Sequence, residues 1–164
     1  MEGISIREVT ANDVEFLFQL MNNPAVMKAL NEVPTRRSDW EEAVLAWRDD
    51  ADEKGYIVFD NAIPIGWFAV NGLLAEDHSA YLKMAALLPA WQGRHIGRHV
   101  VAEILETLRS AGVARVSLFT NRSNRQAQKC YEACGFQVTG TLTEEMSDRT
   151  TAERYRMERS LQEK

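Results

Sequence analysis

The stretch LLPAWQGRHIGR, residues 87–98, joins a predicted strand to a predicted helix, and the rest of the chain can be interpreted outward from it. The first amides of a helix have no partner within the helix, and they carry the positive end of its dipole, roughly half an elementary charge. Gly93 and Gly97 leave the backbone open to close approach, while Arg94 and Arg98 add positive charge. The turn is therefore predicted to bind an anion of the pyrophosphate type.

Two common phosphate-binding motifs are excluded at this turn. A dinucleotide-binding fingerprint needs G-x-G-x-x-G within a strand-helix-strand unit, and residues 87–98 contain no such pattern. A P-loop needs Gly-Lys-Ser or Gly-Lys-Thr, and neither occurs in the sequence. Tight turns without a ligand use the same residue types, so a purely structural interpretation of this turn stays open.

A second segment, NRQAQKCYEACGF at residues 124–136, is predicted to be a helix that ends at Gly135. Its apolar side chains share one helical face: Ala127, Cys130, Tyr131 and Cys134. The two cysteines are too few and too close for a disulfide framework, and they are interpreted as small buried side chains. Tyr131 is either a core aromatic or a residue that takes part in chemistry.

The rest of the chain alternates between strand and helix patterns. Strands are predicted at residues 4–9, 56–59, 63–73, 80–88, 116–120, 137–145 and 152–161. Helices are predicted around residues 14–20, 26–30, 40–47 and 124–134 and from Gly97 to Gly112, with a Thr10/Asp13 capping box and Ser38 as N-cap of the third. This order predicts an α/β fold in a single domain, residues 1–164: a mixed, mostly antiparallel twisted sheet of six to seven strands with helices on both faces.

The composition of the chain is ordinary for one globular domain of 164 residues, with 45% hydrophobic and 26% charged residues. Its apolar runs are shorter than the roughly 20 residues that cross a bilayer, and the N-terminus lacks a signal-peptide pattern. A cytoplasmic protein without a membrane partner is therefore expected. The net charge of -5 argues against a nucleic-acid partner and is compatible with a cationic substrate. No metal site is expected.

Taken together, the two segments resemble the two signature motifs of the GNAT superfamily of N-acetyltransferases. Residues 92–97, QGRHIG, are similar to its acetyl-CoA signature, with Gln92 and Gly97 in register. The second signature is matched by Asn124, Ala127, Tyr131, Gly135 and Phe136. His95 departs from the family pattern because it replaces the first glycine of the turn. Histidine tolerates positive φ better than β-branched residues do, so the turn is expected to persist with adjusted geometry.

The resemblance implies the GNAT fold, an acetyl-CoA cosubstrate and a mechanism. The strand that ends near Leu87 would splay from the strand that begins near Val116, which leaves backbone groups free to pair with the pantetheine arm. The residues implied to hold acetyl-CoA are Ala85, Leu87, Gln92, Gly93, Arg94, His95, Ile96, Gly97, Arg98, Asn124 and Tyr131. An amine would attack the thioester directly, and Tyr131 would act as the catalytic residue that protonates the departing thiolate.

The acceptor is expected to be a primary amine on a small molecule or a peptide, including a protein N-terminus. Deprotonating a lysine ε-amine at pH 7 costs roughly 4.6 kcal/mol, whereas an α-amine costs about 1 kcal/mol. A lysine acceptor therefore needs the stronger base. Glu76, Asp77 and His78 lie in a polar loop before the central strand, and no carboxylate occurs at residues 82–88. A water-mediated base, or none, is expected.

Several alternatives stay open at this level. A noncatalytic acyl-CoA sensor with the same fold is the main one, and an acyltransferase for a longer acyl group is another. Met27, Trp40 and Trp47 either line an acceptor pocket or pack in the core. A homodimer is a candidate assembly.

Overall fold

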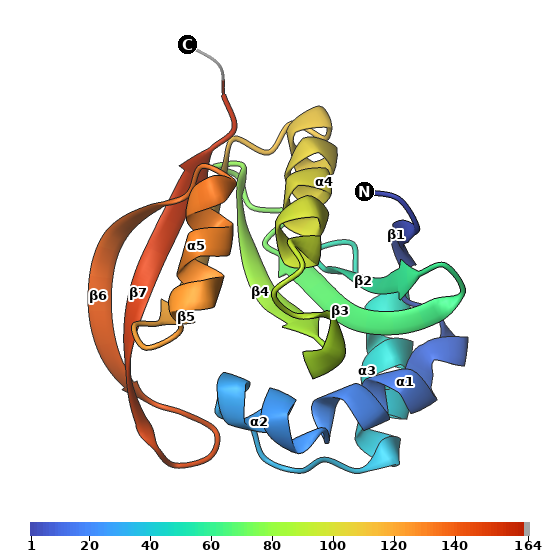
Figure 1. Cartoon of the computed structure of the whole chain (residues 1–164). Helices are drawn as coiled ribbons and strands as arrows, with labels where there is room; N and C mark the ends of the chain where they lie inside the picture. The colour runs from blue at the N-terminus through green and yellow to red at the C-terminus, as the bar shows by residue number, and fades with distance from the viewer. Residues whose placement is uncertain (163–164) are drawn as a thin grey trace.

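The structure is a computed structural model that describes residues 1–162. One sheet of seven strands runs through these residues in the order β1-β2-β3-β4-β5-β7-β6 (Figure 1). The strands are β1 (Ile4–Glu8), β2 (Lys54–Asp60), β3 (Ile63–Asn71), β4 (Ser79–Leu87), β5 (Arg115–Asn121), β6 (Gln137–Glu145) and β7 (Thr151–Ser160). The helices are α1 (Val14–Met21), α2 (Pro24–Leu30), α3 (Arg37–Arg48), α4 (Ile96–Ser110) and α5 (Arg125–Ala133), with short 3-10 turns η1 (Ala11–Asp13) and η2 (Pro89–Trp91). The predicted mixed α/β fold is confirmed.

The sheet splits at its centre, where β4 and β5 form its parallel pair. These two strands pair only from Ser79 opposite Arg115 to Tyr81 opposite Ser117. On its other edge β4 stays paired with β3 as far as Leu87. From Leu82 onward the edge of β4 that faces β5 therefore has no strand partner. The splay that the resemblance implied is confirmed.

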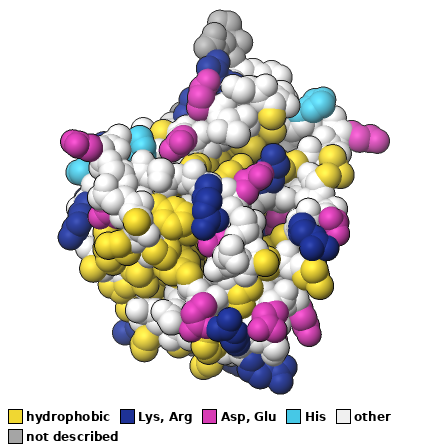
Figure 2. Space-filling model, turned by 90° about the vertical axis from the view of Figure 1, so that its right-hand side faces the viewer, with side chains coloured by type: hydrophobic (Ala, Val, Ile, Leu, Met, Phe, Trp, Pro, Cys, Tyr) yellow, Lys and Arg dark blue, Asp and Glu magenta, His cyan; other side chains and the backbone are white. Residues whose placement is uncertain are grey.

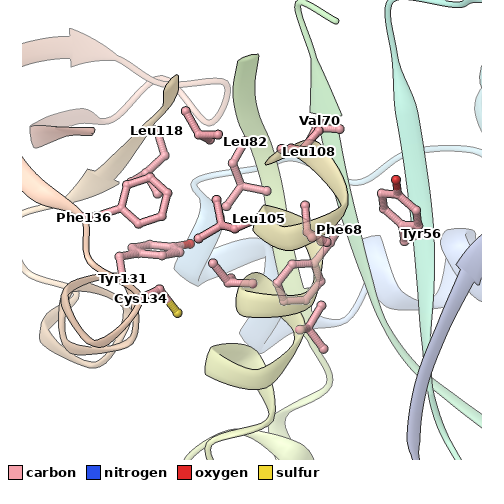
Figure 3. Close-up of a cluster of buried hydrophobic side chains, with 14 of the residues drawn as sticks. Tyr56, Phe68, Val70, Leu82, Leu105, Leu108, Leu118, Tyr131, Cys134 and Phe136 are labelled. Atoms are coloured by element: carbon pink, nitrogen blue, oxygen red, sulfur yellow. The ribbon is translucent and has the colours of Figure 1, made fainter. Parts of the chain in front are cut away.

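Alternating residues of the central strands point to opposite faces of the sheet, and they contribute to two separate cores, one on each face. On one face, side chains of α4 and α5 join Phe68 and Val70 of β3 in the cluster drawn in Figure 3. On the other face α1 and α3 cover Trp67 and Ala69 of the same strand. The predicted placement of helices on both faces is confirmed.

The core beneath α1 and α3 is closed by three tryptophans. The ring of Trp67 meets Trp40 edge-on at 5.5 Å and stacks on Trp47 at 5.3 Å between centroids. Contacts of this kind add to the burial of large apolar surface. Core packing is thus the confirmed interpretation of Trp40 and Trp47.

The starts of the early helices are set by acids. Asp13 accepts a hydrogen bond from the Thr10 amide at 2.7 Å, which confirms the predicted capping box before α1. The prediction of Ser38 as an N-cap is wrong, because α3 already begins at Arg37 with Arg36 as its N-cap. The Asp39 carboxylate accepts from the Arg36 amide at 2.8 Å, and this bond moves the start of α3 toward the N-terminus.

Candidate active site

A cleft of about 360 Å³ opens where β4 and β5 separate. Most of the predicted acetyl-CoA residues line it: Ala85, Leu87, Gln92, Gly93, His95, Ile96, Gly97, Arg98, Asn124 and Tyr131. Arg94 is outside this lining, on the exposed side of the turn. The fold therefore brings both sequence motifs to one cavity, and the binding roles of these residues stay predictions.

The turn at residues 93–98 presents unpaired backbone amides at the start of α4. Gly93 has φ 77° and His95 has φ 64°, so His95 adopts the left-handed conformation usually supplied by glycine. No side chain caps this helix start. Within residues 1–162, the amides from Gly93 to Arg98 donate no hydrogen bond. The turn keeps the shape expected despite the histidine, and its donors are available to a ligand.

Side chains on both sides hold the turn in place. The indole N–H of Trp91 donates to the Asp60 carboxylate at 3.0 Å, which ties η2 to the end of β2. The side-chain amide of Gln92 donates to the Leu87 carbonyl at 2.9 Å. Ile96 is buried at the first position of α4. The free amides therefore belong to an anchored turn and are preorganised.

The two motifs touch where α4 begins beside α5. A Cβ atom added at Gly97 would lie 3.6 Å from the Cys130 sulfur, an ordinary van der Waals distance. One added at Gly93 would lie 3.3 Å from Nε2 of Gln126, at a φ that strains other residues. Glycine at these positions keeps the backbone exposed to the cleft, which fits a diphosphate.

Tyr131 lies at the inner wall of the cleft, on α5. Its side chain is buried, and its ring meets Phe136 edge-on at 5.9 Å between centroids. In Figure 3 the ring extends from α5 toward the middle of the apolar cluster. Burial raises the pKa of the Tyr131 phenol well above its ordinary value, so the hydroxyl stays protonated at neutral pH.

The neighbouring polar groups on α5 have different surroundings. Burial raises the pKa of the Cys130 thiol to about 11, so this cysteine at the cleft wall is not an activated nucleophile. The Asn124 side-chain oxygen accepts from the Ala127 amide at 3.1 Å and so caps α5. Asn124 therefore stabilises the start of α5 and also lines the cleft.

The far end of the cleft is walled by α2, the helix from which the sequence offered Met27 as a pocket residue, but Met27 is not part of the lining. Val26, Ala29 and Leu30 of α2 complete the lining there. The loop between β6 and β7 reaches the end of the same helix (Figure 1), where the Asp148 amide donates to the Asn31 carbonyl at 3.1 Å. No local pattern could have indicated this contact between the loop and α2, because Asn31 and Asp148 are more than a hundred residues apart.

The polar loop before β4 lies at the opposite end of that strand from the cleft. Glu76, Asp77 and His78 are exposed, and none of them lines the cavity. The strand of nine residues separates them from Leu87 by roughly 25 Å. These residues are solvated loop residues, and a base acting from this loop is ruled out by distance.

Neither a metal cluster nor a membrane-spanning helix occurs in the described part of the chain. In residues 1–162 no cluster of His, Cys, Asp and Glu could hold a metal ion. The same residues include no helix with the length and apolar character needed to span a membrane.

Comparison with known families matches residues 17–136 to the Acetyltransferase (GNAT) family. The chain belongs to this family. It is 30% identical over 105 residues to mycothiol acetyltransferase of Brachybacterium faecium, which covers 63% of this chain and 32% of that protein. It is 28% identical over 142 residues to an uncharacterised protein of Methanocaldococcus jannaschii, which covers 83% of this chain and 28% of that protein. The chain thus spans about a third of the length of these relatives.

Solved structures agree with the fold over nearly the whole chain. Spermidine N-acetyltransferase from Vibrio cholerae, in complex with CoA and spermine, has a TM-score of 0.88 at 23% identity, covering 98% of this chain and 97% of that one. A dodecameric structure of a spermidine N-acetyltransferase from the same organism has a TM-score of 0.83 at 21% identity, covering 98% and 95%. The predicted family is confirmed, and the expected class of acetyl-CoA-dependent N-acetyltransferase agrees with these matches.

Proposed function

We propose that this protein transfers an acetyl group from acetyl-CoA to a primary amine by direct attack within a ternary complex. The observation that carries the proposal is the anchored turn at residues 93–98, whose unpaired amides open onto a cleft that contains Tyr131. Membership of an acetyltransferase family supports the same conclusion. Acetyl-CoA supplies an activated acetyl thioester and a diphosphate that suits the turn.

The cleft offers suitable positions for each part of the cosubstrate. The amides of residues 93–98 would receive the diphosphate, assisted by the Arg98 guanidinium. The unpaired edge of β4, with Ala85 and Leu87 in the cleft lining, would pair with the pantetheine arm. Both contacts use backbone groups that would otherwise need water, so they are available without breaking a protein hydrogen bond.

Tyr131 is proposed as the acid that assists departure of the thiolate. Its raised pKa keeps it protonated, but it also makes the phenol a weaker acid than a thiol with an ordinary pKa of about 8.5. Tyr131 therefore assists by donating a hydrogen bond to the sulfur as negative charge develops and the C–S bond breaks. The proton lost by the attacking amine balances the charge of the thiolate, so the overall transfer leaves Tyr131 unchanged.

An α-amine is the acceptor that the cleft supports best. No carboxylate is among the described residues of the lining, and the wall at α2 is apolar through Val26, Ala29 and Leu30. Without a carboxylate base, an amine that costs about 1 kcal/mol to deprotonate at pH 7 is favoured over one that costs roughly 4.6 kcal/mol. We therefore favour a peptide N-terminus, or a small amine of similarly low pKa, over a lysine side chain.

Thiol release from acetyl-CoA, measured against a panel of amines, tests this function. The panel pairs a peptide with a free N-terminus against the same peptide with a blocked N-terminus and a free lysine, and adds polyamines and aminoglycosides. We expect turnover with the free N-terminus and little with the blocked peptide. Tight acetyl-CoA binding with no release for any amine would favour the noncatalytic sensor instead.

Three further expectations belong to the same proposal. Residues 1–164 would act as one acetyltransferase domain, and the protein would reside in the cytoplasm. A multimer, a homodimer at the simplest, is proposed because one structural relative is described as a dodecamer. Light scattering of the purified chain tests the assembly directly.

A further inference from the structure

The basic side chains of this protein are mostly balanced by acids. Arg7 pairs with Asp13, Arg115 with Glu158, and Arg154 with Glu144. On the face drawn in Figure 2, basic and acidic side chains lie next to one another. This is the pattern expected of a chain whose net charge is -5.

The segments around the starts of α4 and α5 differ from this pattern. They carry four exposed basic side chains: Arg94, Arg98, Arg125 and Lys129. Within residues 1–162, none of these four makes an ion pair with a carboxylate. Arg98 and Lys129 line the cleft, whose described lining includes no acid.

These positions are also unfavourable for cations in the protein by itself. The first turns of η1, α1 and α3 each include an acid, as the positive end of a helix dipole favours. The first turns of α2, α4 and α5 include none, and those of α4 and α5 have Arg98 and Arg125 instead. Arg125 and Lys129 are four residues apart on α5, a spacing at which like charges repel. Cations at helix starts and like charges four residues apart both cost stability, and such unfavourable features found together are typical of a binding site.

The amount of positive charge exceeds what a diphosphate needs. A diphosphate bridge carries about two negative charges, one for each phosphorus. The free amides and Arg98 already face the position proposed for it. CoA carries in addition a phosphomonoester on the 3′ carbon of its ribose, with about 1.5 to 2 negative charges at pH 7. Arg125 and Lys129 are the cations left over, and they lie on the neighbouring helix.

We propose that Arg125 and Lys129 recognise the 3′-phosphate of CoA, so that the protein discriminates acetyl-CoA from 3′-dephospho-acetyl-CoA. This inference rests on the proposed function, because it assumes that the cleft binds acetyl-CoA. Lys129 reaches the site from the cleft wall, and Arg125 lies one turn nearer to the start of α5. The two side chains form charge-assisted contacts with the phosphomonoester, and these contacts remove the repulsion between them.

Calorimetric titration with acetyl-CoA and with 3′-dephospho-acetyl-CoA tests the inference. We expect the wild-type protein to bind acetyl-CoA about tenfold more tightly. In the double variant Arg125→Gln/Lys129→Gln, the affinity for acetyl-CoA should fall to that for the dephospho compound. The affinity for 3′-dephospho-acetyl-CoA should stay unchanged, which also reports that the variant is folded.

A control with the same change of charge is the double variant Lys28→Gln/Arg48→Gln. Both residues are exposed and lie outside the cleft lining, so discrimination should be retained. Equal affinity of the wild-type protein for both compounds would overturn the inference and leave the proposed function intact. Discrimination that persists in Arg125→Gln/Lys129→Gln would overturn the assignment to these residues. Failure of the wild-type protein to bind either compound would overturn the inference and the proposed function together.

Discussion

The helix starts that follow Thr10 and His95 satisfy their backbone amides in opposite ways. At the first, Thr10 and Asp13 cap each other, and Arg7 donates two hydrogen bonds of 2.8 Å to the same carboxylate. At the second, His95 is in a left-handed conformation, no side chain caps the helix, and cations replace the acid. A helix start whose donors are satisfied contributes to stability, whereas one left open is available for a ligand.

Closing the open start should have the largest effect. Gly97→Glu places a carboxylate and two further carbon atoms where the diphosphate is proposed to bind, so the affinity for acetyl-CoA should fall at least about 100-fold. Calorimetry measures the loss. Gly97→Ala is the matched control, because its Cβ meets only ordinary contacts within the protein and carries no charge, so the affinity should fall much less than with glutamate. Unaltered binding by the glutamate variant would contradict the proposed site.

Removing the phenol hydroxyl of Tyr131 should have the second-largest effect, and this effect should fall on the chemical step. Tyr131→Phe should lower kcat about 100-fold, while the Kd for acetyl-CoA stays the same, because the hydroxyl acts only as the thiolate departs. Single-turnover measurements with a genuine acceptor check this. If the chemical step were unchanged across the pH range, Tyr131 would be a core aromatic and no more.

Breaking the closed start should lower stability and spare binding. Asp13→Ala removes the cap and leaves the Arg7 guanidinium without its partner, so the free energy of unfolding should fall by about 2 kcal/mol. Denaturant unfolding measures it, and the Kd for acetyl-CoA should not change. Asp39→Ala, which removes the more exposed cap of α3, should cost less, about 1 kcal/mol or below. Equal losses of unfolding free energy in both variants would contradict the extra stabilisation assigned to the contact between Arg7 and Asp13.

The closed start should also respond to acid. Burial acts to raise the pKa of Asp13, but the hydrogen bonds from Arg7 and Thr10 outweigh it and hold the pKa below its ordinary value. A depressed pKa in the folded state means that the stabilisation is complete above the unfolded value of about 3.9 and is lost as the pH falls through the folded value. Thermal unfolding of wild type and Asp13→Asn should therefore converge as the pH falls below the lowered pKa of Asp13 in the folded state.

Relieving the backbone at the open start should have the smallest effect. His95→Gly removes the side chain from a left-handed conformation and should raise the free energy of unfolding by about 0.5 kcal/mol, since part of the gain is offset by the flexibility of glycine in the unfolded chain. His95→Val should destabilise instead, because β-branched residues tolerate this conformation poorly. An equal loss of stability in His95→Gly and His95→Val would indicate that the imidazole makes a stabilising contact.

Local sequence determined much of this protein. Hydrophobic periods of two and of 3.6 predicted the seven strands and five helices, and residues 92–97 with 124–136 indicated both halves of the cleft. These features depend on near neighbours along the chain, since backbone conformation, capping and amphipathic faces are set within a few residues. The wrong prediction of Ser38 as N-cap was also a local error. The Asp39 carboxylate, three residues beyond Arg36, sets the start of α3.

Only the tertiary structure decided how the cleft is enclosed. The insertion of β7 between β5 and β6 sets where the loop between β6 and β7 lies, and that loop meets α2 across more than a hundred residues. Contacts of this kind depend on strand order, which no local pattern encodes. They determine which free amides, cations and apolar walls face one another.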